Sequence, residues 1–393
     1  MNLVSVYSDK KDFKENVKDL VQQLKTELGE EPQLIVVFPS RMFIDYAASL
    51  PNEFRQYLPK TMVAGCIGSV LMVDDREEAF NPGIVAMGAV LPKVSVEVVH
   101  IDPDEAPGED ASPADWVEYT GVEVQGNQHF LLFADPFSAG VETVLQGLDY
   151  AYTCPVSGGF SSGTQFAGEV SLFAGEKAVH SGVVLLSLSG EIEIVSLVAQ
   201  GCRPVGENLT INECDDLVLS KVNGVSPIDY LNSLAEVLDE TDVELLQSSS
   251  FLGVEMDTLK TELSHGDYLI RNICGINPES GSLVIGDQLQ KGEVVRFHVR
   301  DPQSCRAELE DMTSSFKAKF ASRRCKGILL FSCLGRVEEF YGEKAVDSKL
   351  VRAVQEDAPL CGFFCSGEIG QVGSNTYIHG YTASALYFYE PGE

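Results

Sequence analysis

Positive charge, histidine and tryptophan are scarce in this 393-residue sequence. Lys and Arg total 28 against 59 Asp and Glu, which gives a formal net charge of −31, and there are 6 His and 1 Trp. A surface this acidic repels the phosphates of nucleic acids and of anionic lipid headgroups. We therefore expect neither a nucleic-acid partner nor a membrane partner.

Long apolar runs and targeting patterns are also missing. No stretch approaches the roughly 18 apolar residues that a membrane span requires. Residues 1–17 have neither the apolar core of a signal peptide nor the Arg-rich character of a transit peptide. A hydrophobic content of 44% is nevertheless typical of a globular protein. Together these features predict a cytoplasmic protein with two or three domains.

The usual signatures of metal, phosphate and hydrolase sites are absent or incomplete. The ten cysteines form no CxxC pair and have no His at zinc-finger spacing, so we expect no metal site. No GxxxxGK[ST] phosphate loop occurs. The G-x-S-x-G match at 159–163 is not followed by a helical pattern, which favours a Gly-rich turn over a nucleophile elbow. We do not predict an enzyme from these patterns.

One pattern occurs three times: an apolar strand, a helix, and a second strand that ends in Gly, Ser and Cys. The first strands are expected at 34–40, 129–136 and 327–336, and the second strands at 61–69, 153–163 and 359–370. Their apolar character is continuous rather than alternating, which indicates strands that are covered on both faces. The repetition predicts one architectural unit that is used three times.

The segments around these units complete the predicted architecture. Residues 10–28 have the apolar spacing of an amphipathic helix, and the acidic, Pro-bearing segment 102–118 is expected to be a solvated loop. Gly, Ser and Pro near residue 225 indicate a boundary followed by a new helix. We predict an α/β (α+β) fold with two tandem domains, residues 1–224 and 225–393, whose mixed β-sheets are flanked by helices.

The strand at 327–336 delivers Cys333 and Arg336 to one rim of its sheet. A guanidinium group suits a carboxylate ligand, and a nearby cation lowers the pKa of a thiol. The segment 362–370 places Glu368 among glycines, where backbone N–H groups can approach a ligand closely. Two interpretations stay open: these residues line a ligand pocket, or Arg336 and Glu368 form an ion pair that locks two strand ends together.

Several of these segments resemble the FIST family over nearly the whole chain. The resemblance is carried by GILLFSCLGR and APLCGFFCSGEIG in the C-terminal half and by MVAGCIGSVLMVDDREE and CPVSGGFSSG in the N-terminal half. FIST proteins have an N-terminal and a C-terminal FIST domain and occur in bacterial signalling proteins and eukaryotic F-box proteins. The family is thought to bind small ligands, with amino acids proposed, and to pass occupancy to a signalling partner. The resemblance therefore implies a sensor of amino acids or related small polar metabolites that acts through a separately encoded protein.

The resemblance also implies which residues bind the ligand. Matched to the family's segments, they are Cys333, Arg336, Gly367, Glu368, Gly370, Gly158, Gly159, Arg203 and Cys66. The turn after Cys66 departs from the family pattern, because it continues as IGSVLMVDD instead of small residues and glycine.

Two alternatives accompany the sensor hypothesis. Some bacterial family members resemble haem-dependent nitric oxide sensors, which makes the Cys154–Pro155 pair a candidate haem ligand, although we expect no cofactor. A thiol-dependent enzyme that uses Cys333 is the other alternative. The sequence does not predict an oligomeric state.

Overall fold

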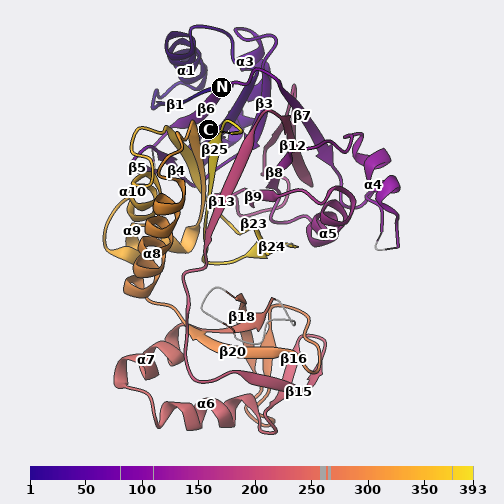
Figure 1. Ribbon diagram of the computed structural model, residues 1–393, viewed down its shortest axis with the longest axis vertical. Coiled ribbons are helices and arrows are strands. Elements are labelled where there is room, and N and C mark those ends of the chain that lie inside the picture. Colours follow the sequence, from indigo (N-terminus) through magenta and orange to yellow (C-terminus); the bar gives the residue numbers. More distant parts are fainter. Residues whose placement is uncertain (80, 109, 257–262, 264–266, 374, 393) are drawn as a thin grey trace. The chain divides into compact units, whose positions relative to one another are not determined.

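The structure is a computed structural model that describes every residue except 80, 109, 257–262, 264–266, 374 and 393. These described residues form two compact units (Figure 1). Unit 1 comprises 1–198 and 309–393, and unit 2 comprises 199–308, so the sequence-predicted boundary near 225 falls inside unit 2. Several mixed sheets flanked by helices confirm the predicted α+β fold class.

Unit 1 contains three repeats with the same order of elements. Each repeat has an outer strand, a first and a second strand that pair in parallel, a hairpin, and a closing antiparallel strand. The outer strands are β1 (Asn2–Ser8), β7 (Val94–Ile101) and β13 (Glu193–Ala199). The parallel pairs are β2 (Leu34–Pro39) with β3 (Met62–Cys66), β8 (Gln128–Ala134) with β9 (Val156–Phe160), and β21 (Gly327–Cys333) with β22 (Leu360–Cys365). The closing strands are β6 (Ile84–Val90), β12 (Val183–Gly190) and β25 (Ala383–Tyr389). Unit 2 follows β13 directly, inside the third repeat.

The hairpin of each repeat completes the sheet of another repeat. The hairpins are β4 (Val70–Val73) with β5 (Arg76–Ala79), β10 (Leu172–Ala174) with β11 (Lys177–Val179), and β23 (Glu368–Val372) with β24 (Asn375–His379). β4 pairs with β22 of the third repeat, β10 with β3 of the first, and β23 with β9 of the second. All three six-stranded sheets therefore have the same strand order, and every sheet contains strands of two repeats.

A glycine marks the same position in the second strand of each repeat. The three residues, each followed by the residue opposite it in the first strand, are Gly65 and Val37, Gly158 and Leu132, and Gly362 and Leu330. A Cβ atom at any of these glycines would lie about 2 Å from the carbonyl oxygen of the opposite residue. Only glycine fits there, and the shared contact aligns the three repeats. The predicted threefold use of one unit is thus confirmed.

The inner faces of the three sheets meet in one hydrophobic core. Phe38, Phe133 and Phe331 follow the three residues that face the glycines, so they occupy equivalent positions. Their ring centroids lie 5.7, 6.1 and 6.3 Å apart, within the range of favourable aromatic pairs. These rings mark the axis around which the repeats are arranged.

The helices cover the outer faces of the sheets. They are α1 (Phe13–Leu28), η1 (Arg41–Phe43), α2 (Ile44–Ala47), α3 (Leu50–Arg55), α4 (Pro113–Thr120), α5 (Val141–Tyr152), α8 (Pro302–Phe320), η2 (Leu334–Arg336), α9 (Glu338–Tyr341) and α10 (Val346–Arg352). Helices α8 to α10 and helices α4 and α5 lie on opposite flanks of unit 1 (Figure 1). Among the described residues, no helix is long and apolar enough to cross a membrane.

One predicted loop contains a helix. The segment 102–118 was expected to be solvated, but α4 begins inside it, where Ser112 and Asp115 form a capping box and Pro113 occupies the first turn. Trp116 of this helix is buried against Gly147 of α5. The capping box and the burial of Trp116 therefore stabilise a helix in a segment whose composition is acidic.

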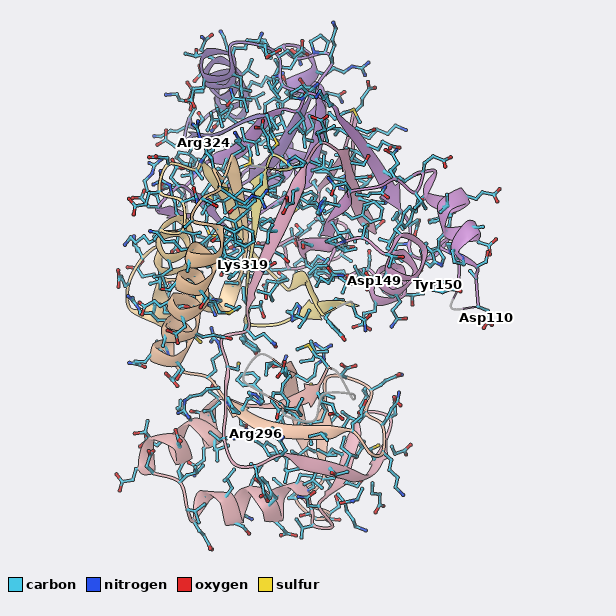
Figure 2. All side chains as sticks on the ribbon, in the orientation of Figure 1. Asp110, Asp149, Tyr150, Arg296, Lys319 and Arg324 are labelled. Carbon is cyan, nitrogen blue, oxygen red and sulfur yellow. The ribbon has the colours of Figure 1, made fainter. Side chains whose placement is uncertain are left out.

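Contacts between hairpins and helices tie neighbouring repeats together. The backbone N–H and the Oγ1 hydroxyl of Thr376, on β24, donate hydrogen bonds to Asp149 of α5, each over 2.6 Å. Asp149 is labelled in Figure 2. At the equivalent place in the first repeat's sheet, Arg55 and Glu176 form an exposed ion pair. Two of the three exchanged hairpins are thus fastened to the helices that they meet.

Unit 2 is a strand-rich body with its own core. Its strands are β14 (Arg203–Pro204), β15 (Leu209–Asp215), β16 (Val218–Val222), β17 (Ser250–Glu255), β18 (Tyr268–Ile276), β19 (Leu283–Ile285) and β20 (Val294–Val299). β17 pairs with both β18 and β20, so six of these strands close into a ring. Helices α6 (Pro227–Ala235) and α7 (Glu240–Ser248) pack on it, and α6 begins at the predicted Ser-Pro signal.

Candidate functional site

The structure brings most of the sequence-predicted site residues to the carboxyl ends of the parallel strands in unit 1. Glu368 and Ile369 of β23 lie opposite Gly159 and Gly158 of β9. Cys333 lies opposite Cys365. Burial raises the pKa of the Cys365 thiol, and the nearby groups of Glu368, Cys66 and Cys333 raise it further. Whether these residues bind a ligand remains a prediction.

Two of the predicted residues lie elsewhere. Gly370 is further along β23, beside Val198 and Ser384. Arg203 belongs to unit 2, where its guanidinium forms ion pairs with Asp242 and Asp301. These contacts raise the pKa of Arg203 and give it a structural partner on each side.

Cys333 occupies a capping position at which the other two repeats have a side-chain oxygen as the hydrogen-bond acceptor. Its Sγ accepts a hydrogen bond from the backbone N–H of Gly335, 3.4 Å away. Ser40 and Asp135 directly follow the first strands of the other repeats, and each likewise accepts a hydrogen bond from the N–H two residues later. The thiol is partly exposed, and its capping role explains why the chain turns immediately after β21.

Arg336 is buried, and its carboxylate partner is Asp347. Its Nε and Nη2 donate to Asp347 over 2.7 and 3.0 Å, and its Nη1 donates to the carbonyl oxygen of Tyr381 over 3.1 Å. Both ends of the ion pair have no exposed side-chain surface. A bidentate pair of this kind is strong and geometrically specific, so the guanidinium is held in one orientation.

Asp347 is the hub of this buried network. Besides Arg336, it accepts hydrogen bonds from the hydroxyls of Ser332 and Tyr341. Four donors satisfy the carboxylate oxygens, as a buried charge requires. Sequence reasoning missed Asp347, because it lies in the first turn of the short helix α10 and nothing in its neighbourhood marks it as buried.

Glu368 is also fully buried, but it is incompletely satisfied. Its Oε2 accepts from the backbone N–H of Thr382 over 3.1 Å, whereas its Oε1 has no hydrogen-bond partner. Burial raises the pKa of Glu368 well above its usual range; the charge of Arg336 lowers it and that of Asp347 raises it. Burial therefore favours the protonated carboxyl more than in an exposed glutamate, close to the Arg336–Asp347 pair.

Backbone strain lies on both sides of the network. Ala345, which precedes α10 and Asp347, has a φ of 59°, and Tyr381, which accepts from Arg336, has a φ of 66°. Left-handed conformations of such residues cost on the order of 1–3 kcal/mol each and persist where the surrounding structure imposes them. Strain of this kind often accompanies functional sites.

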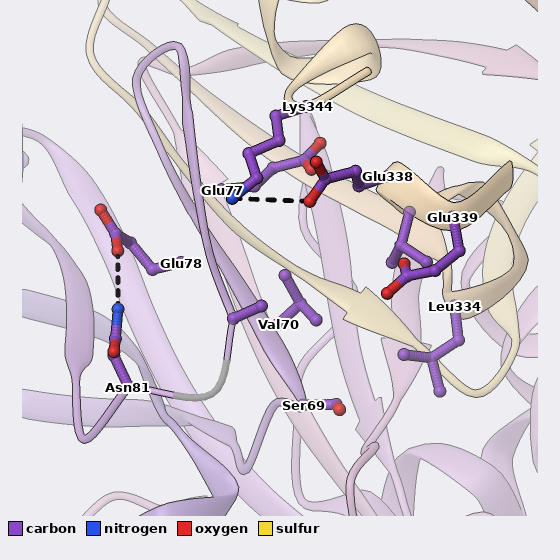
Figure 3. Close-up of a pocket in the computed structure, with 11 residues that line it drawn as sticks. Ser69, Val70, Glu77, Glu78, Asn81, Leu334, Glu338, Glu339 and Lys344 are labelled. Carbon is purple, nitrogen blue, oxygen red and sulfur yellow. Dashed lines mark hydrogen bonds and ion pairs between the residues drawn. The ribbon is translucent and has the colours of Figure 1, made fainter. Parts of the chain in front are cut away.

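A cavity of about 360 Å³ opens beside this network (Figure 3). It lies between the β4–β5 hairpin and the segment that follows β21. Its lining residues are Ser69, Val70, Glu77, Glu78, Ala79, Asn81, Leu334, Val337, Glu338, Glu339 and Lys344. None of the nine sequence-predicted residues is among them, but Ser69 follows the Cys66 turn, and Leu334 directly follows Cys333.

The cavity carries four carboxyl groups and one amine. Lys344 pairs with Glu338 over 3.5 Å, and Asn81 donates to Glu78 (Figure 3). Burial raises the pKa of Glu77 to about 7, the Ala345 N–H lowers it, and the charge of Asp347 raises it. Glu77 therefore links the cavity electrostatically to the buried network.

The structure also places Ser161 and Cys154, whose sequence patterns suggested a nucleophile elbow and a haem ligand. Ser161 is fully buried and donates to the carbonyl oxygen of Ile67, and no helix follows it, so the G-x-S-x-G match is a turn as predicted. Burial, reinforced by Asp149, raises the pKa of the Cys154 thiol to about 12. Cys154 is 6% exposed, and a haem at this thiol stays a prediction. Throughout the described part of the chain, no group of His, Cys, Asp and Glu could hold a metal ion.

Comparisons with known proteins agree with the sequence segments. The FIST N domain matches residues 33–225 and the FIST C domain matches residues 231–371. An uncharacterized protein of Mycobacterium bovis is 28% identical over 388 residues, 97% of either chain. Another from Mycobacterium tuberculosis is 28% identical over 363 residues, 92% of either chain. A cyanuric acid hydrolase structure from A. caulinodans aligns over 98% of this chain and 99% of that chain, but a TM-score of 0.33 at 7% identity is too low for inference.

Proposed function

Because the chain belongs to the FIST family, with both a FIST N and a FIST C domain, we propose that it is a sensory protein whose cavity binds a small molecule with a primary ammonium group. FIST domains are generally linked to small-ligand sensing in signalling. Amino acids and related amines are the ligand class. The charge of the cavity carries this proposal, because four carboxyl groups face one lysine in a space of about 360 Å³.

The walls of the cavity suit an ammonium group on a short organic body. Val70, Leu334 and Val337 supply apolar surface, while Glu77 and Glu338 supply acceptors. Pockets for small molecules typically combine an apolar lining with a few polar groups that fix orientation. Lys344 can meet the carboxylate of an amino acid, since its amine already pairs with the carboxylate of Glu338.

The position of the cavity suits a sensor. Its lining comes from the β4–β5 hairpin of the first repeat and from η2 and α9 of the third. Closure around a ligand would draw these segments together and alter the adjoining surface. A separately encoded signalling protein that recognises this surface would then report occupancy.

Thermal stability in the presence of matched compounds tests the proposal. A ligand that binds only the folded state raises the melting temperature. We expect stabilisation by n-butylammonium, L-leucine or L-lysine, and none by butyrate or 1-butanol, which lack the ammonium group. Glu77→Gln should weaken the response, whereas Glu53→Gln, an acid on α3 outside the cavity, should retain it. A protein that responds to none of the ammonium compounds would contradict the proposal.

A further inference from the structure

Glu368 stands where the other two repeats have leucine. Leu71, Leu172 and Glu368 lie opposite Phe363, Cys66 and Gly159, the residues that follow the three aligning glycines. All three side chains are fully buried. The fold therefore fills this position with an apolar side chain twice, and a carboxyl group is not needed to build it.

The environment of Glu368 is that of a group that exchanges a proton. The charged and titratable groups that face it from the surrounding elements are Arg336, Asp347, Cys365 and His379. Arg336 and Asp347 already neutralise each other. A proton on Glu368 keeps the three-group network at zero net charge, and its Oε1 is left without a partner.

We propose that Glu368 exchanges its proton for the positive charge of a ligand bound in the cavity. This inference rests on the proposed function. A cation beside Glu77 adds positive charge close to Asp347, and ionisation of Glu368 restores neutrality next to Arg336. The proton leaves the carboxyl oxygen for the solvent, the electron pair stays on Glu368, and no other bond forms or breaks. Occupancy of the cavity thus becomes a change of charge at a buried position where the second and third repeats meet.

The linkage to pH follows from the buried acid. The folded-state pKa of Glu368 lies above its unfolded value, so its contribution to stability is fully present below the unfolded pKa. That contribution is lost as the pH rises toward the folded pKa, because the unfolded chain then releases the proton and the folded chain must retain it. A leucine at this position has no such loss.

Ligand-free melting curves between pH 5 and pH 9 test the role of Glu368. We expect Glu368→Leu to melt at least about 2 °C above the wild type at pH 8, with the difference shrinking toward pH 5. Glu368→Gln should show the same flattened pH profile, which separates the lost proton from the change of shape. Glu53→Gln removes one negative charge elsewhere and should follow the wild-type profile. A Glu368→Leu protein that melts below the wild type at every pH would show that the carboxyl is structural, and would overturn the inference.

Proton release on binding tests the exchange itself. Titration with n-butylammonium at pH 7, in two buffers of different ionisation enthalpy, measures the protons released per ligand bound. Glu77 releases part of a proton in both proteins, so we expect the wild type to release about one proton more than Glu368→Gln. Equal release overturns the exchange while the proposed function stands. Absence of binding by n-butylammonium, L-leucine and L-lysine alike overturns both.

Discussion

The third repeat differs from the first two at positions that the fold itself aligns. Where the first and second repeats bury Leu71 and Leu172, the third buries Glu368. Where the first repeat buries Phe43, three residues after its Ser40 cap, the third buries Arg336, three residues after Cys333. Both positions carry an ionisable side chain in the third repeat only. Because the same backbone is built with leucine and phenylalanine, these charges are not requirements of folding, and they point to function.

The common backbone is the first part of this comparison to test. Gly65→Ala, Gly158→Ala and Gly362→Ala each bring a Cβ to about 2 Å from a carbonyl oxygen of the paired strand. Neither backbone can yield without breaking the parallel pair, so we expect all three variants to yield no soluble folded protein. Gly275→Ala is the control, because its new Cβ would have no neighbour closer than 3.6 Å. If one of the three variants yields soluble folded protein, its glycine is not equivalent to the other two.

A glutamate at the equivalent position of the second repeat tests whether only the third repeat tolerates a buried acid. Leu172→Glu buries a carboxyl at the position equivalent to Glu368. We expect a loss of about 5 kcal/mol in the free energy of unfolding, which is typical of a buried unpaired charge. The loss should grow from pH 5 to pH 8, because burial raises the pKa of the new acid and ionisation then opposes folding. Denaturant unfolding at both pH values measures it, and a Leu172→Glu protein as stable as the wild type would mean that this position tolerates charge in every repeat.

Breaking the ion pair tests the second position. Arg336→Met leaves Asp347 buried without its bidentate partner, and removal of one member of such a pair typically costs about 3–5 kcal/mol. The double change Arg336→Met with Asp347→Asn removes the orphaned charge and should recover most of that loss. Urea unfolding of the single and double variants decides the matter. No recovery in the double variant would argue that shape, and not charge, is what Arg336 provides.

The smallest effect is expected where the repeats meet at the surface. Arg55 and Glu176 are both more than half exposed, and exposed pairs contribute little. Glu176→Gln should change the free energy of unfolding by less than about 0.5 kcal/mol. Asp149→Asn, at the equivalent but half-buried contact with Thr376, should cost more. An equal cost for both would show that the hairpins are fastened alike in the two sheets.

Sequence reasoning found the local units of this fold. The three strand–helix–strand patterns, the helix at 10–28 and the helix start at Ser226 all depend on neighbouring residues, and the structure contains each of them. The exchange of hairpins was not predicted, because pairs such as Leu71 with Phe363 leave no local signal. A helix at 113–120 was missed for a related reason, since one buried Trp outweighs an acidic surrounding.

Some residues of the buried network were named from the sequence, and whether they bind a ligand stays a prediction. Cys333, Arg336 and Glu368 were singled out because Gly, Cys and Arg at strand ends are chemically informative. Asp347 and the cavity residue Glu77 were not, because acidic residues are frequent in this chain and their burial depends on which distant elements cover them. The same limit applies to the choice between a pocket and an ion pair, since the partner of Arg336 is set by the packing of α10 against β21.

The exchanged hairpins have a consequence for synthesis in the cell. β4 must wait for β22, which leaves the ribosome roughly 290 residues later, or about 15 to 60 seconds at common elongation rates. During that time the first repeat presents an unfinished sheet and an unpaired hairpin to its surroundings. The nascent chain is therefore exposed to aggregation until its last hundred residues arrive, and chaperones that shield strand edges should act on it early.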